Sequence, residues 1–136
     1  MRQSIKVLSG ALDQSEEGDI VLRGVIDPAS LELIQVAEDH REKDTEAQIS
    51  KLMKALVESN VPDIELGCRG GHYSERDGAF YIKDPVYVVD GFQRVSAALR
   101  LMEEDRSKQP RLGATIHFNT TEDEERERFR ILNAER

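Results

Sequence analysis

The sequence has 136 residues, the length of one domain with a single hydrophobic core. Hydrophobic residues make up 38% and charged residues 34%, and no apolar run approaches the roughly 20 residues that a membrane-spanning helix needs. The formal net charge of −8 argues against a grip on nucleic acid over the whole surface, because such binding depends on neutralising phosphates. An acidic surface would suit a basic protein partner. The single cysteine, Cys68, excludes an internal disulfide, so we expect a cytoplasmic protein. Because no long apolar run is present, we also expect no membrane contact.

Two strands are predicted at the start of the chain. Residues 4–12 and 19–26 are apolar segments on either side of a polar, glycine-containing turn, as in a pair of short strands. We expect residues 1–19 to form a peripheral strand or arm. Residues 28–40 predict a weak helical turn or an extended lead-in to the next element.

A firmer helical pattern follows at residues 44–60. Asp44 or Thr45 would cap the start of this helix, and Pro62 marks its end. Residues 63–69 then predict a strand. The apolar positions at helical spacing are Ile49, Leu52, Met53, Leu56 and Val57.

The second half of the chain alternates strands and helices. Asp77-Gly78 is a favoured turn pair for a two-residue hairpin. The predicted order is a hairpin (72–84), a strand (86–90), a helix (92–105), a strand (114–119) and a charged helix (121–136). We therefore predict one α+β (mixed α/β) domain over residues 1–136, with helices packed on a small mixed sheet.

The strand-turn-helix at residues 86–101 contains the strongest functional signal, the pentapeptide DGFQR. A helix N-terminus presents unpaired N–H groups to anions, and Gly91 lets backbone approach a ligand. Arg94 would add a two-pronged contact to a phosphate. An arginine in a first turn opposes the helix dipole unless an anion or carboxylate offsets it. The alternative is a plain connection, with Asp90 as the N-cap and Arg94 paired with a surface acid.

DGFQR, after a hydrophobic strand and before an alanine-rich helix, resembles the DGQHR signature of the ParB/sulfiredoxin-like superfamily. The flanking segments extend this resemblance to about residues 20–136. The resemblance implies a nucleotide or nucleic-acid phosphate site at Gly91, Gln93 and Arg94, with Asp90 as a polar or metal-side partner. It also implies a DNA-modification, plasmid or phage-related system, and a nucleoside triphosphate with Mg²⁺ as the candidate cofactor.

Departures from the family pattern limit what the resemblance implies. Sulfiredoxin-like enzymes place a reactive cysteine inside this turn, where the present chain has Phe92, so thiol chemistry is not expected. ParB-type clamps have a second arginine in the motif and a helix-turn-helix domain, so sequence-specific DNA reading by this chain alone is not expected. A non-catalytic, acidic protein-interaction module on the same fold is the second hypothesis. A metal-dependent nuclease or nucleotide phosphohydrolase using Asp90 is the third, since no complete catalytic constellation is evident.

The glycine-rich segment GCRGGH at residues 67–72 is the other candidate region. We expect Arg69 to bind the same ligand, because in the family fold this strand end would lie beside the 90–94 turn. Cys68 and His72 suggest a nucleophile pair or metal ligands, but a metal site needs about four ligands. A structural role is therefore the favoured interpretation of both Cys68 and His72, with Cys68 filling the core.

Three further observations separate the hypotheses. A basic pocket formed by Arg69, Arg94 and Arg100 would favour the phosphate binder. An Arg94 held by neighbouring acids would favour the interaction module. A second carboxylate facing Asp90 across an open cleft would favour the enzyme.

His117 alternates with the apolar positions of its strand, so we expect it at the surface or half-buried.

Overall fold

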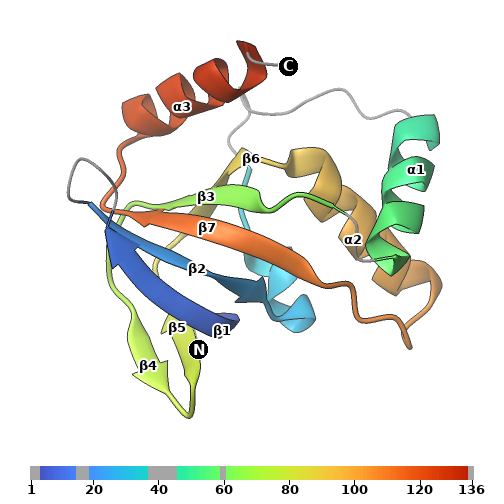
Figure 1. The fold of residues 1–136 in the computed structure, drawn as a ribbon, viewed down its shortest axis with the longest axis horizontal. Coiled ribbons are helices and arrows are strands. Elements are labelled where there is room, and N and C mark those ends of the chain that lie inside the picture. Colours follow the sequence, from blue (N-terminus) through green and yellow to red (C-terminus); the bar gives the residue numbers. More distant parts are fainter. Residues whose placement is uncertain (1–3, 15–18, 37–45, 59–60, 135–136) are drawn as a thin grey trace.

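The computed structural model describes residues 4–14, 19–36, 46–58 and 61–134, and within them seven strands form one mixed sheet with helices packed against it (Figure 1). The predicted α+β class is confirmed. The strands are β1 (Ile5–Gln14), β2 (Ile20–Ile26), β3 (Ile64–Cys68), β4 (Ser74–Arg76), β5 (Ala79–Ile82), β6 (Val86–Asp90) and β7 (Leu112–Phe118). The helices are the 3-10 helix η1 (Pro28–Leu33), α1 (Glu46–Val57), α2 (Phe92–Glu104) and α3 (Glu122–Ala134).

The strands are ordered β4-β5-β1-β2-β7-β3-β6 across the sheet. The pairing of β3 with β7 is parallel, and the other neighbouring strands are antiparallel. The N-terminal strand β1 lies inside the sheet, hydrogen-bonded to β5 on one side and β2 on the other, so the expectation of a peripheral strand or arm is wrong. Its apolar residues Ile5 and Val7 are buried, which explains the central position.

One face of the sheet holds the hydrophobic core. A row of buried side chains crosses four adjacent strands at this face, because the registers place Leu22 beside Ile116, Ile116 beside Leu66 and Leu66 beside Val88. The helices α1 and α2 and the turn η1 contribute to the same cluster. Val57, predicted as an apolar contact of α1, is 54% exposed and lies off this face.

The predicted β4–β5 hairpin is confirmed, with Asp77 and Gly78 both at positive φ (54° and 79°), as a two-residue turn of the I′ type requires. The predicted helix caps Asp44 and Thr45 lie outside the described residues. No helix in the described part of the chain combines the length and apolar content needed to cross a bilayer.

Helix α3 lies over the opposite face, away from α1 and α2 (Figure 1). Among its described side chains Glu125 alone is fully buried, at 1% exposure, while Phe129 and Leu132 are half-buried. Because little apolar surface of α3 is buried, the attachment of this helix to the sheet depends on polar contacts such as those of Glu125. The polar side chains beneath α3 are therefore functional candidates.

Candidate functional site

The strand-turn-helix around the DGFQR motif forms as predicted. Strand β6 ends at Asp90, α2 begins at Phe92, and Gly91 occupies the N-cap position with φ of 115°. A side chain at Gly91 would be strained at this φ and would collide with Ile64 on the neighbouring strand. Glycine is therefore explained by local packing, and Asp90 is not the N-cap residue.

Arg94 is buried, contrary to the expectation of an arginine presented to a ligand. Its side chain is 10% exposed, and its Nη1 donates to the carbonyl oxygens of Pro62 (2.8 Å) and Asp63 (2.7 Å). Its Nη2 donates to Asp90 Oδ2 at 3.1 Å. The carboxylate that offsets this first-turn arginine is thus internal, one helical turn earlier in the chain.

Gln93 and the candidate arginines do not form a basic pocket. Gln93 Nε2 donates to Gln48 Oε1 of α1 at 3.3 Å. Arg100 pairs with Glu46, also on α1, at 2.8 Å. Arg69 and Arg94 each pair with a different acid, Glu125 and Asp90, so the three arginines Arg69, Arg94 and Arg100 form three separate ion pairs. Within the described residues, no group of three His, Cys, Asp or Glu side chains could hold a metal.

Arg69 does not lie beside the 90–94 turn. Strands β3 and β6 are antiparallel, with Cys68 opposite Val86 and Glu65 opposite Asp90. Arg69 therefore follows the end of β3 that faces the start of β6. The expected position is wrong because it required the end of β3 to lie next to the end of β6.

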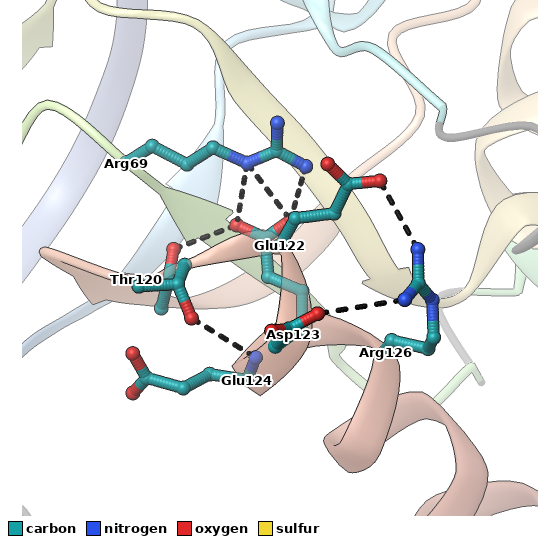
Figure 2. Close-up of polar contacts among 8 residues, drawn as sticks. Arg69, Thr120, Glu122, Asp123, Glu124 and Arg126 are labelled. Carbon is teal, nitrogen blue, oxygen red and sulfur yellow. Dashed lines mark hydrogen bonds and ion pairs between the residues drawn. The ribbon is translucent and has the colours of Figure 1, made fainter.

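Arg69 instead anchors α3. Its Nη2 and Nε donate to Glu125 Oε1 at 2.8 and 3.2 Å, and its guanidinium carbon lies 3.8 Å from the ring centroid of Tyr87. Thr120 Oγ1 donates to the other carboxylate oxygen, Oε2 of Glu125, at 2.7 Å. Arg69 and Thr120 are labelled in Figure 2. A side chain at Gly67 would collide with this carboxylate, so glycine there makes room for the anchor. Glu125 is therefore a structural carboxylate.

A second polar group lies beneath α3, around Glu65 of β3. Arg128 donates from Nε to Glu65 Oε2 (2.6 Å) and from Nη2 to Oε1 (3.0 Å). Burial raises the pKa of Glu65, but contacts with His117 and Arg128 outweigh it and lower the pKa to about 2. Of these two side chains, Arg128 is the one within hydrogen-bonding distance of Glu65, because His117 Nε2 lies 3.9 Å from Glu65 Oε1. Glu65 is thus a carboxylate at neutral pH.

A groove of about 850 Å³ lies between α3 and this face of the sheet. Its apolar lining consists of Val21, Val89, Phe118, Ile131 and Leu132. Its lining also includes five carboxylates against two guanidiniums: Asp19, Asp123, Glu124, Glu125 and Glu127, with Arg23 and Arg128. The lining therefore combines apolar surface with more carboxylates than guanidiniums. Three of these carboxylates pair with arginines outside the lining: Glu125 with Arg69, Asp123 with Arg126 and Glu127 with Arg130.

The remaining sequence candidates do not form a reactive site. Cys68 is fully buried, and burial raises the pKa of its thiol. His72 pairs through Nδ1 with Asp84 Oδ2 at 2.9 Å, and its side chain is largely exposed. Asp90 faces Arg94, and Glu65, its neighbour across the strands, is held by Arg128, so these two carboxylates do not face one another across a cleft.

Comparison of the chain with protein-family models, with curated proteins and with solved structures finds no match. The resemblance to the ParB/sulfiredoxin-like superfamily therefore rests on DGFQR and its flanking segments, and it stays a prediction.

Proposed function

We propose that this protein is a non-catalytic interaction module that binds a cationic, partly apolar segment of a protein partner in the groove beneath α3. The observation that carries the proposal is the composition of the groove, in which five carboxylates outnumber two guanidiniums around an apolar lining. Complementary charge guides such an encounter, and apolar side chains of the partner gain by leaving water.

Exposure of the apolar and acidic side chains supports this proposal. Ile131 of α3 is 50% exposed although it lines the groove, so a partner side chain can cover it. Asp123, also on α3, is 93% exposed at the rim. A rim acid of this kind chiefly increases the association rate and makes binding sensitive to salt.

Phosphate binding at the 90–94 turn receives less support from the geometry. Arg94 uses its donors on two backbone carbonyls and Asp90, so a phosphate would have to compete with three internal acceptors. Asp90 also places a negative charge at the turn. These contacts favour the interaction module over the phosphate binder.

Calorimetric titration with a short peptide of alternating arginine and leucine tests the proposal, with a peptide of alternating glutamate and leucine as the control ligand. We expect binding of the arginine peptide only, and weaker binding as the salt concentration rises. The double variant Asp123→Asn/Glu124→Gln should lower the affinity about three- to tenfold. The matched variant Glu103→Gln/Glu104→Gln, which removes two exposed acids at the end of α2, should not. Equal losses in both variants would contradict a site in the groove.

A further inference from the structure

The ion pair between Arg128 and Glu65 resembles an arginine ligand bound by a carboxylate in a binding site. Glu65 projects from β3 with a side chain 20% exposed, while Arg128 reaches it from the surface helix α3 and is 48% exposed. Two parallel N–H···O bonds of 2.6 and 3.0 Å join the guanidinium to the carboxylate. This two-pronged arrangement is how proteins recognise a guanidinium in trans.

His117 adds an unused polar atom to the same place. Its Nε2 is buried and has no hydrogen-bond partner among the described residues, and it lies 3.9 Å from Glu65 Oε1. Buried polar atoms are nearly always paired, so this nitrogen can take a hydrogen-bond partner that the described residues do not supply. An imidazole nitrogen can donate or accept a hydrogen bond, depending on the tautomer of the ring.

Arg128 and His117 both line the groove, whereas Glu65 lies beneath the guanidinium. We propose that Arg128 is an internal substitute for the ligand, and that an arginine side chain of the partner displaces it to bind Glu65 and His117. This inference rests on the proposed function and names the group that the groove recognises. Arg128 then acts as an autoinhibitory contact within α3.

The surrounding contacts permit the exchange of Arg128 for an arginine of the partner at Glu65. Glu65 keeps a guanidinium partner throughout, so no buried carboxylate is left unpaired. Glu124 lies one turn before Arg128, the i,i+4 order in which a glutamate and an arginine pair well on a helix. Helix α3 stays attached through Glu125 and Arg69. The cost is a lower apparent affinity, since the site is open for only a fraction of the time.

Titration of the full chain with the arginine–leucine peptide tests this inference. Arg128→Ala should bind the peptide about three- to tenfold more tightly than the wild type, because the competitor is removed. Arg130→Ala is the matched control, since Arg130 is an exposed arginine of the same helix that forms an ion pair with Glu127. Arg128→Gln, which keeps part of the side-chain stem, should show the same gain.

The double variant Glu65→Gln/Arg128→Ala should lose the gain, because the carboxylate that receives the peptide is gone. Peptide binding that is equal in the wild type, Arg128→Ala and Arg130→Ala would overturn the inference and leave the proposed function standing. A gain that persists in the double variant would overturn it as well. Binding to Arg128→Ala but not to the wild type would support strong autoinhibition. Absence of binding to every variant would overturn both proposals.

Discussion

Arg94 in the first turn of α2 and Asp90 at the end of β6 form a buried ion pair at 3.1 Å, with side chains only 10% and 9% exposed. The same guanidinium donates to the backbone carbonyls of Pro62 and Asp63, where the chain enters β3. Arg94 therefore ties α2 to the start of the neighbouring strand. Its role in this structure is to hold the two elements together.

Replacing Arg94 with Met should lower the free energy of unfolding by about 3–5 kcal/mol, because Asp90 and two carbonyl oxygens lose their donor in a buried place. Urea denaturation followed by circular dichroism measures this change. The matched control is Arg100→Met, since Arg100 is 40% exposed and its partner Glu46 is 82% exposed. The control should cost less than about 1 kcal/mol. Similar small losses in both variants would show that Arg94 is not a structural residue.

Glu125→Gln should detach α3 from the sheet. The substitution removes the charge that receives Arg69 and weakens the bond from Thr120, at a cost of about 1–3 kcal/mol. Hydrogen exchange should become faster in α3 than in the strands, because so little apolar area holds this helix. Glu122→Gln, at an exposed position of the same helix, should leave the exchange unchanged. Unchanged protection of α3 in Glu125→Gln would contradict the anchor.

Glu65 should make the protein sensitive to acid. Folding lowers the pKa of Glu65 to about 2, so the stabilisation is complete above its unfolded pKa of about 4.3 and is lost as the pH falls toward 2. At pH 7 the wild type should exceed Glu65→Gln in free energy of unfolding by on the order of 2–3 kcal/mol. This difference should shrink below about pH 5. Glu75→Gln, at an exposed site on β4, is the control, and a constant difference from pH 7 to acid would refute the assignment.

Cys68 should behave as a structural thiol. Burial raises its pKa and keeps reagents away, so alkylation with iodoacetamide at neutral pH should wait for unfolding. The rate in native buffer should be far below that of an unfolded peptide containing the same cysteine. Faster modification of the native protein than of the peptide would indicate an activated thiol and a different chemistry.

The strand-turn-helix was predictable from sequence because its signals are local. Apolar residues at 86–89, Gly91 and the helical spacing after it define the elements with no distant information. The partners of Arg94 were not predictable in this way, since Pro62 and Asp63 lie 32 and 31 residues away in the chain. Burial of an arginine depends on such distant acceptors.

The groove was missed for a related reason. Glu125 belongs to a run of four acids that reads as a solvated first turn, and nothing in the run separates it from its exposed neighbours. Its partner Arg69 is 56 residues away. Gly67 in β3 and Arg69 just after this strand were a signal, but they indicate a carboxylate partner only after the sheet order is known.

Chemical-shift mapping of the isotope-labelled protein tests the central claim most directly, because one experiment observes the groove and the 90–94 turn together. Separate titrations would use the arginine–leucine peptide and ATP with Mg²⁺. We expect the peptide to shift the amide signals of Val21, His117 and α3, and ATP to leave Gly91 and Gln93 unchanged. Shifts at Gly91 and Gln93 with ATP, together with none in the groove with the peptide, would contradict the account and favour the phosphate site.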